Sequence, residues 1–349
     1  METVPPSGPR SALAEVDAAG AFKRTPSNYR HTIGDSEKVY KPEAGRYHLY
    51  ISLACPWANR CLAVLNLKGL REVIGVTTVH PTWRRSRPND PNDQHCGWFF
   101  HDSSTREPVA SATGHGAFVI EGCTPDPVNN CNFVRDLYDL VNDTNGKYTV
   151  PVLWDKKTST IVNNESSEII RICNSSFNDF ATNKEIDLYP ADETLRAEID
   201  ERNDVIYHTI NDGVYRCGFA KTQEAYDLAV SALFASLDAL DELLATRRYL
   251  TGSLLTEADV RLFMTLIRFD EVYIVYFKTS NRFISSYKHL RNYCRDLYQI
   301  PAIGSSIDMS HIKTHYFSSH PQLNPFAIVP AGPGVIADLQ LPHDRNRSF

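Results

Sequence analysis

The segment from residue 47 to residue 79 restricts the fold more than any other part of the chain. Residues 47–54, YHLYISLA, are apolar with a strand-like composition, and a Cys-Pro pair follows at once. Residues 56–70 then carry apolar side chains at helical spacing, and Gly69 fits a helix end. Residues 72–79, EVIGVTTV, have the β-branched content of a second strand. This order of strand, helix and strand predicts a partly parallel sheet with a right-handed crossover.

Cys55 stands at the junction between the first strand and the helix. Pro56 suits the first helical turn, where its missing N–H costs nothing. The unpaired N–H groups and the dipole of the helix favour a negative charge there, so we expect a lowered pKa for the Cys55 thiol and a nucleophilic role. The alternative is a small buried core residue, the commonest fate of a free cysteine.

The spacing after Cys55 predicts a site that works with one thiol. A dithiol site would place a second cysteine three positions on, where this chain has Ala58. Cys61 is six positions on, about 9 Å along a helix axis, and is a poor resolving partner. A small external thiol must therefore complete the cycle. We interpret the remaining cysteines as structural or incidental: Cys61, Cys96, Cys123, Cys131, Cys173, Cys217 and Cys294.

Composition and patterning predict two domains of different class. Residues 1–46 read as an irregular arm, and residues 47–180 as an α/β domain in which 80–127 form a long insertion rich in Pro and Gly. The aromatic residues of this insertion, among them Trp83 and Trp98, indicate that it packs near a site. Strand signals disappear from about residue 190, so 190–320 are expected to be all-helical and 321–349 an extended tail.

The overall chemistry of the chain excludes several classes of protein. The 349 residues carry a net charge of −6, which does not suit bulk nucleic-acid binding. No stretch approaches about 18 uninterrupted apolar residues, so we expect no membrane span. The N-terminal residues lack the pattern of a secretory signal, and eight irregularly spaced cysteines are typical of reduced thiols. We therefore expect a cytoplasmic protein.

Two further segments have the chemistry to hold a ligand. Val150 precedes Pro151 and so prefers an extended backbone, able to pair with a peptide-like ligand; sequence does not tell whether the bond is cis. Glu165, Ser166 and Ser167 open a predicted helix, where N–H groups suit a carboxylate and Glu165 suits an ammonium. The alternative at this helix start is ordinary capping, with Asn164 as the cap.

Two other patterns are assigned no chemistry. His311 and His315 are four residues apart, with His320 nearby, but no carboxylate or cysteine pattern supports them, so we expect no metal. Thr256 and Asp259 have capping-box spacing, which is a folding signal.

Taken together, these features resemble the cytosolic glutathione transferases, a thioredoxin-like domain followed by an all-helical domain. The chain is most similar to the xi class, the glutathionyl-hydroquinone reductases. The resemblance runs from about Tyr47 to Pro330 and is carried by LYISLACPWANR, HPTWRRSRPNDPND, GWFF, GCTPDPVN, YTVPVLWDKKTSTIVNNESSEIIR, NDGVYRCGFA, TEADVRLFMTLIRFDEVY and HIKTHYF.

The resemblance implies a role for particular residues. Cys55 would be the catalytic nucleophile, and glutathione, the co-substrate, would be held by Trp98, Val150, Glu165 and Ser166. The acceptor pocket would be lined by Tyr215, Tyr273 and Tyr316, of which Tyr215 and Tyr316 would act in catalysis. Asn59 replaces the histidine of the family's common CPWAH, from which we expect a tuned activity and not a lost one.

The implied reaction is the glutathione-dependent reduction of glutathionyl-hydroquinones through a mixed disulfide between Cys55 and glutathione, in a homodimer. Two alternatives stay open. One is an omega-like thioltransferase or dehydroascorbate reductase that uses the same Cys55, and the other is a non-catalytic glutathione-binding regulatory protein, because a fold does not fix a function.

Overall fold

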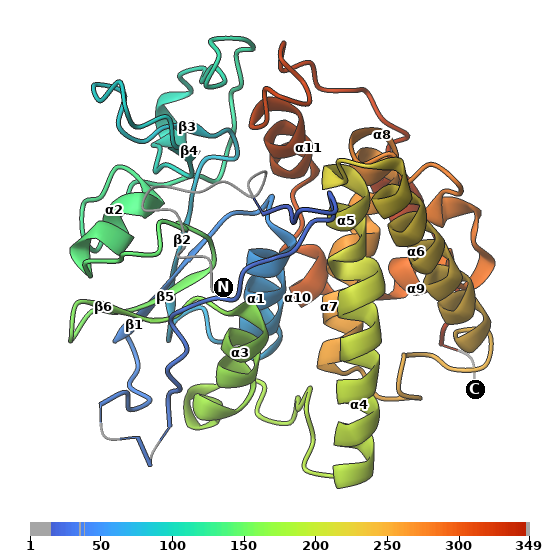
Figure 1. Cartoon of the computed structure of the whole chain (residues 1–349). Coiled ribbons are helices and arrows are strands. Elements are labelled where there is room, and N and C mark those ends of the chain that lie inside the picture. Colours follow the sequence, from blue (N-terminus) through green and yellow to red (C-terminus); the bar gives the residue numbers. More distant parts are fainter. Residues whose placement is uncertain (1–14, 35, 38, 347–349) are drawn as a thin grey trace.

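The computed structural model describes residues 15–34, 36–37 and 39–346. Residues 1–14 of the predicted arm and residues 347–349 of the predicted tail lie outside this range. The described chain forms two halves side by side, an α/β half that contains a four-stranded sheet and a helical half (Figure 1). This confirms the expected fold class.

The sheet of the α/β half is mixed. Its strands are β1 (Tyr47–Ile51), β2 (Gly75–Thr78), β5 (Val152–Asp155) and β6 (Thr160–Asn163), in the order β2-β1-β5-β6. β1 is parallel to β2 and antiparallel to β5, and β5 is antiparallel to β6. The predicted parallel pair of strands is thus confirmed. Every residue of β1 is buried, because helices and the insertion cover both faces of the sheet.

Helix α1 (Pro56–Leu67) begins directly after Cys55, as predicted. Cys55 is the N-cap residue with an extended backbone, at φ −80° and ψ 119°, and Pro56 occupies the first turn. Gly69 follows the helix end with φ +67°, a conformation that suits glycine. Most of α1 is buried, since it packs against α3 (Ser166–Arg171) on one side and α7 (Glu257–Arg268) on the other. α1 therefore lies at the junction of the two halves.

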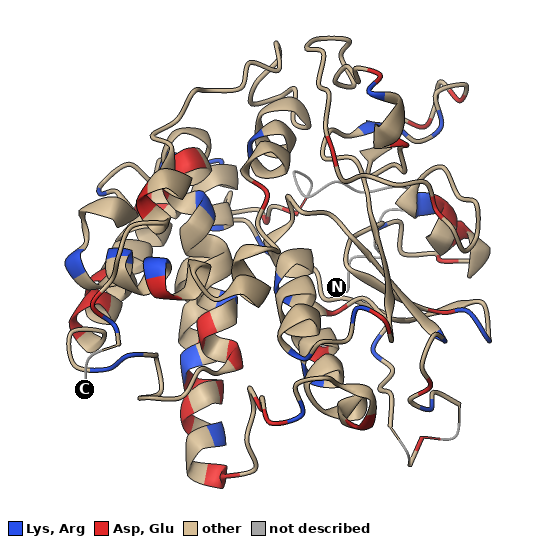
Figure 2. Cartoon of the chain, turned by 180° about the vertical axis from the view of Figure 1, so that it is seen from behind, with Lys and Arg blue, Asp and Glu red and all other residues tan. Residues whose placement is uncertain are grey.

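The helical half surrounds α7, most of whose residues are buried. Its helices are α4 (Glu193–Ile206), α5 (Gly213–Phe219), α6 (Gln223–Leu243), α7, α8 (Ile274–Tyr276), α9 (Lys288–Tyr298), α10 (Pro301–Gly304) and α11 (Met309–Ser318). Acidic and basic residues both occur along α4 (Figure 2). No helix in the described part of the chain is long and apolar enough to cross a bilayer.

The insertion and the two terminal segments depart from regular structure. The insertion holds the short antiparallel pair β3 (Arg84–Arg85) and β4 (Cys96–Gly97), and helix α2 (Val134–Leu140) follows it. The insertion packs against α11, where the hydroxyls of Thr82 and Ser318 lie 2.7 Å apart. Within residues 321–346, the described part of the tail, turns at 321–323 and 325–326 and the short helix α12 (Val335–Leu339) interrupt the extended chain, and the sequence analysis did not predict this helix.

Candidate active site

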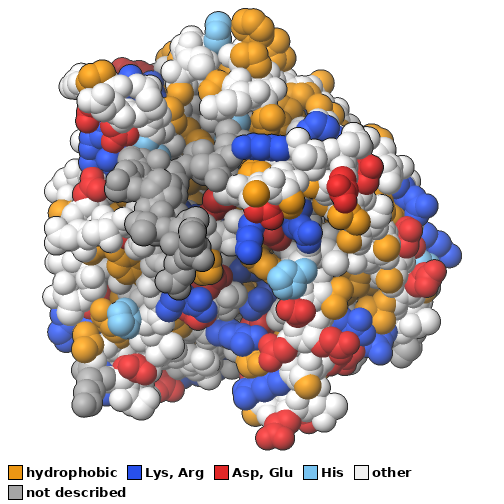
Figure 3. Space-filling view, viewed as in Figure 1, with side chains coloured by type: hydrophobic (Ala, Val, Ile, Leu, Met, Phe, Trp, Pro, Cys, Tyr) orange, Lys and Arg blue, Asp and Glu red, His pale blue; other side chains and the backbone are white. Residues whose placement is uncertain are grey.

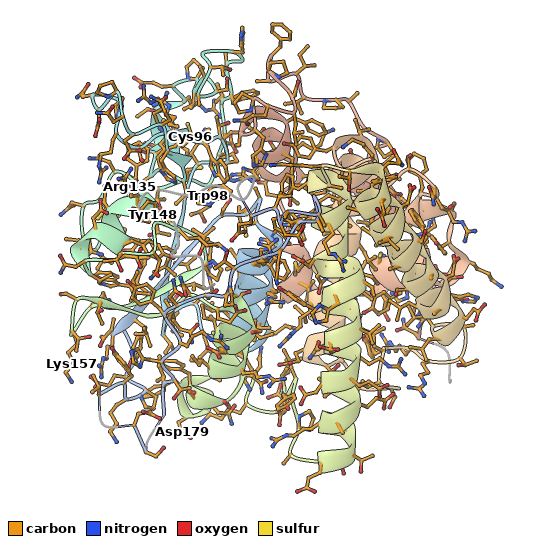
Figure 4. All side chains as sticks on the ribbon, viewed as in Figure 1. Cys96, Trp98, Arg135, Tyr148, Lys157 and Asp179 are labelled. Carbon is orange, nitrogen blue, oxygen red and sulfur yellow. The ribbon has the colours of Figure 1, made fainter. Side chains whose placement is uncertain are left out.

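A cavity of about 350 Å³ lies between the two halves. Its walls come from the N-terminal arm, the start of α1, the insertion, residues 147–151, the start of α3, helix α5 and helix α11. Part of the insertion is labelled in Figure 4, where Cys96 and Trp98 lie near Arg135 and Tyr148 in the α/β half. The cavity thus joins segments that are far apart in the sequence.

Cys55 lines this cavity and is 9% exposed. Its Sγ atom donates a hydrogen bond to the carbonyl oxygen of Val150 at 3.7 Å. Burial raises the pKa of the thiol, and this outweighs the lowering by the Ala58 N–H, Arg268, the Trp57 N–H and Arg24. The expected lowering of the pKa is therefore wrong, because the helix start is enclosed by protein.

The other cysteines of the described chain are also unpaired. Cys61 is buried in α1, and its Sγ atom lies 3.4 Å from the carbonyl oxygen of Trp57. Cys96 lines the same cavity as Cys55 and is partly exposed, with burial raising the pKa of its thiol. Cys96 is thus the second cysteine with access to the cavity.

The four residues proposed to hold glutathione, Trp98, Val150, Glu165 and Ser166, all line the cavity. The bond between Val150 and Pro151 is cis. Trp98 stacks on His315, with ring centroids 4.4 Å apart. The structure thus brings together four residues that are spread over 69 positions of the sequence, from 98 to 166.

Glu165 is the N-cap residue of α3. Its carboxylate accepts hydrogen bonds from the Ser167 N–H at 3.0 Å and the Ser27 hydroxyl at 3.1 Å. Burial acts to raise the pKa of Glu165, but Arg60, 3.6 Å away, and these hydrogen bonds lower it below its ordinary value. Capping by Asn164, the alternative considered from the sequence, is not observed, because the Asn164 side chain bonds Tyr29 and Tyr138 instead.

The Ser166 hydroxyl is engaged by an arginine. Its Oγ atom accepts hydrogen bonds from Nε and Nη2 of Arg60 at 3.0 and 2.7 Å. The Arg60 guanidinium also stacks over Trp57. Arg60 therefore restrains the Ser166 side chain at the start of α3, and the Ser166 hydroxyl, which only accepts in these bonds, keeps its own proton to donate.

Three tyrosine hydroxyls form a buried chain. The Tyr316 hydroxyl lies 2.7 Å from that of Tyr215 and 3.1 Å from that of Tyr273. Burial raises the pKa of all three phenols, so each keeps its proton. Tyr215 and Tyr316 line the cavity, whereas the fully buried Tyr273 lies behind Tyr316 and not on the wall, unlike the expectation from the sequence.

Comparison with known proteins identifies the family. Residues 54–176 match the profile of the glutathione S-transferase N-terminal domain, and residues 223–296 that of the C-terminal domain. The glutathionyl-hydroquinone reductase YqjG of Escherichia coli is 45% identical, with 95% of this chain and 94% of YqjG covered. The glutathione S-transferase omega-like 2 of Schizosaccharomyces pombe is 43% identical over 90% of this chain and 94% of its own length.

Solved structures agree with this assignment. The xi glutathione S-transferase of Phanerochaete chrysosporium has a TM-score of 0.81 and 46% identity, covering 94% of this chain and 97% of its own. This chain belongs to the xi class of glutathione transferases. The glutathione-bound structure of YqjG is also similar, with a TM-score of 0.80 and 42% identity over 92% of this chain and 97% of that one.

The N-terminal arm of this xi-class transferase contributes a residue that the sequence analysis missed. Arg24 lines the cavity, pairs with Asp212 at 2.8 Å and stacks over Trp57 and Tyr215. The arm is anchored on both halves, since the Gly20 carbonyl accepts from the Lys221 N–H of the helical half and the Ser27 hydroxyl donates to Glu165 of the α/β half. Nothing in the local pattern around Arg24 indicates this contact, because the contact depends on the tertiary fold.

His311 and His315 of α11, and His320 just after this helix, serve the packing of the xi-class fold. His315 bonds the carbonyl oxygen of Pro81 through Nδ1, so that nitrogen carries the proton. His311 bonds the carbonyl oxygen of Glu121, and His320 bonds the Tyr276 hydroxyl. No group of three or more metal-ligating side chains is found in the described residues.

Space-filling Figure 3 shows Lys and Arg side chains gathered near the middle of the face that joins the two halves. Among the cations that line the cavity are Arg24 and Lys147. Lys147 binds the Glu15 carboxylate at 2.6 Å and the Thr25 carbonyl at 2.9 Å. Both cations are thus paired with carboxylates of the chain, Arg24 with Asp212 and Lys147 with Glu15.

Proposed function

We propose that this enzyme reduces glutathionyl-hydroquinones to hydroquinones, with glutathione as co-substrate and Cys55 as the nucleophile. The chain is a glutathione-dependent enzyme, since it belongs to the xi class, and YqjG is named a glutathionyl-hydroquinone reductase. The observation that carries the proposal is that a thiol at a helix start, Cys55, and a pair of bonded phenols, Tyr215 and Tyr316, line one cavity.

Glutathione is proposed to lie along the α/β side of the cavity. The backbone of Val150 would pair with the peptide of glutathione, as a strand does with its neighbour. The start of α3 at Ser166 would receive a carboxylate, and the ionised Glu165 would meet the ammonium group. Trp98 supplies an apolar surface close to these groups. This placement directs the glutathione sulfur toward Cys55, whose Sγ atom bonds the Val150 carbonyl.

In the first step, the Cys55 thiolate attacks the sulfur that joins glutathione to the aromatic ring. The carbon–sulfur bond breaks, its electron pair remains on the ring carbon, and a disulfide forms between Cys55 and glutathione. The ring carbon must then accept a proton. The phenol of Tyr215 or Tyr316 is the proposed general acid, because both keep their protons and line the cavity.

In the second step, the thiolate of another glutathione attacks the mixed disulfide. Oxidised glutathione leaves and Cys55 returns as a thiolate. The substrate has thus gained two electrons, and two glutathione sulfurs have become a disulfide. Cys61 takes no part, because it is buried and lies six positions away in α1.

We also propose that the enzyme acts as a homodimer in the cytoplasm. The unpaired state of the cysteines in the described chain supports a reducing compartment. The dimer is an implication of the xi-class resemblance alone. Sedimentation analysis of the purified protein tests it, with a single species of twice the chain mass expected and a monomer contradicting it.

An omega-like thioltransferase or dehydroascorbate reductase is the second candidate, favoured by the name of the Schizosaccharomyces relative. Substrate preference separates the two. We expect turnover of glutathionyl-menadiol to exceed that of hydroxyethyl disulfide and dehydroascorbate, and to be abolished in Cys55→Ala. A clear preference for either of the latter substrates would instead assign the omega-like activity.

A further inference from the structure

Arg268 is a completely buried cation at the end of α7. Its guanidinium donates to the carbonyl oxygens of Ala54 at 3.1 Å and Leu53 at 3.3 Å, to that of Met264 at 2.6 Å, and to the side-chain oxygen of Asn59. All four acceptors are neutral. Arg268 thus reaches from the helical half to the two residues directly before Cys55.

The other arginines around the cavity have carboxylate partners. Arg24 pairs with Asp212 at 2.8 Å, and Arg60 lies 3.6 Å from Glu165. No Asp or Glu of the described chain lies within 4 Å of the Arg268 guanidinium as an ion pair. A buried charge without a counter-charge is costly, so an anion that forms beside Arg268 would be stabilised by it.

The titratable groups on which Arg268 acts are Cys55, Tyr273, His315 and Tyr316. Among them, Cys55 is the one that must carry a negative charge in the proposed reaction. The guanidinium bonds the carbonyl of Ala54, the residue that precedes the thiol. We propose that Arg268 is the counter-ion of the Cys55 thiolate. It is a positioning residue, held at the start of α1 by the carbonyls of Ala54 and Leu53, whose positive charge stabilises the Cys55 sulfur both when it attacks and when it leaves. This deepens the proposed function, because it concerns the same nucleophile.

Asn59 acquires a role in this arrangement. Its side-chain oxygen accepts from Arg268, and its side-chain nitrogen donates to the Ser306 carbonyl at 2.9 Å. Asn59 is fully buried in α1 and does not line the cavity. The residue at the position of the family's common histidine thus acts on the thiol through the orientation of Arg268.

The charge near Cys55 is not set by Arg268 alone. Five titratable or charged groups interact electrostatically with Cys55. They come from the arm, α1, α5, α7 and the segment before α8: Arg24, Cys61, Tyr215, Arg268 and Tyr273. The two cations favour the thiolate. Arg24 is already paired with Asp212, so Arg268 is the cation whose charge is uncompensated.

The test measures the ionisation of Cys55 without any quinol substrate, so its outcome is independent of the proposed activity. Full-length wild type, Arg268→Gln and Arg268→Lys are treated with iodoacetamide from pH 6 to pH 11, and the alkylation of the Cys55 peptide is followed by mass spectrometry. Arg345→Gln is the packing control, because Arg345 is equally buried and donates to the carbonyls of Leu244, Arg247 and Arg248, away from Cys55.

We expect Arg268→Gln to slow alkylation of Cys55 about tenfold at neutral pH, a rise of about one unit in its measured pKa. The rates of this variant and wild type should converge at high pH, where the thiol is fully ionised in both. Arg268→Lys should restore most of the rate, and Arg345→Gln should match wild type. An unchanged pH profile in a folded Arg268→Gln variant, or an equal change in Arg345→Gln, would overturn the proposal.

A second pair of variants keeps the proposal testable where Arg268→Gln does not fold. Cys55→Asp places an ionisable carboxyl group beside Arg268, and Cys55→Asn is its neutral match. With Arg268 as counter-ion, the Cys55→Asp protein should unfold at neutral pH at a temperature equal to or above that of Cys55→Asn. A carboxylate that destabilises the protein strongly relative to the amide would show that no effective counter-charge is present.

Discussion

Replacing Tyr316 by phenylalanine removes the central hydroxyl of the tyrosine chain. The Tyr316 hydroxyl lies 2.7 Å from the Tyr215 hydroxyl and 3.1 Å from the Tyr273 hydroxyl, and Tyr316 lines the cavity. The variant keeps the ring and its packing, so any loss arises from one oxygen. In the proposed reaction this oxygen, or that of Tyr215, delivers the proton to the ring carbon.

The structure sets the expected size of the effect. Loss of a positioned general acid lowers the rate constant by a factor of about 10²–10⁴. A factor of about 100 corresponds to about 2.7 kcal/mol of activation free energy. The buried Tyr273 hydroxyl also loses its partner, which should lower the free energy of unfolding by about 1–3 kcal/mol. Tyr273→Phe breaks the 3.1 Å bond as well, but leaves the pair of Tyr215 and Tyr316 on the cavity wall.

The assay compares these two variants on two reactions. With glutathionyl-menadiol, kcat/KM should fall about 100-fold in Tyr316→Phe and less than about tenfold in Tyr273→Phe. Reduction of hydroxyethyl disulfide needs no proton on a ring carbon, so both variants should retain it far better. Equal losses in the two variants, or full activity of Tyr316→Phe on the menadiol conjugate, would refute the proton-transfer reasoning.

Three further outcomes are expected. Glu165→Gln should raise the KM for glutathione about tenfold or more, because the carboxylate that meets the ammonium group is lost; an unchanged KM in initial-rate kinetics would contradict this placement. Asp259→Ala should lower the free energy of unfolding, measured in urea, by about 3 kcal/mol or more. The reason is that the carboxylate accepts hydrogen bonds from the buried N–H groups of Leu250 and Thr256 and from the Tyr293 hydroxyl. A change below about 1 kcal/mol would show that these donors find other partners. Since burial raises the pKa of the Cys55 thiol, its thiolate fraction in the purified enzyme should still increase above pH 9. The thiolate is followed by its ultraviolet absorbance, with Cys55→Ala as the blank. A thiolate signal that is complete by pH 7 would show that the helix start and the cations dominate.

The strand, Cys-Pro and helix of the first segment were predictable because their signals are local. Pro56 and Gly69 mark the two ends of α1, and β-branched residues mark β2. The capping box of α7 is similarly local, and Thr256 donates to Asp259 through both its N–H and its hydroxyl. Family resemblance then supplied the tyrosines, which no periodicity distinguishes from the other fourteen of the 17 in the chain.

What the sequence did not predict depends on contacts between distant segments. The pKa of Cys55 was expected to fall because the helix start is visible in the sequence, whereas the enclosure that raises it is not. Arg24 reaches the cavity through an arm that shows weak periodicity, and Arg268 reaches Ala54 across 214 positions. The place of Tyr273 behind Tyr316 likewise follows from the packing of α11 against the segment before α8.

The most direct test follows the Cys55 sulfur through one turnover. The enzyme is mixed with a glutathionyl-menadiol in the absence of free glutathione, quenched in acid and digested for mass spectrometry. Release of menadiol should accompany an adduct of glutathione mass on the Cys55 peptide, and added glutathione should remove that adduct. Menadiol released without modification of Cys55, or with the adduct on Cys96 instead, would contradict the account.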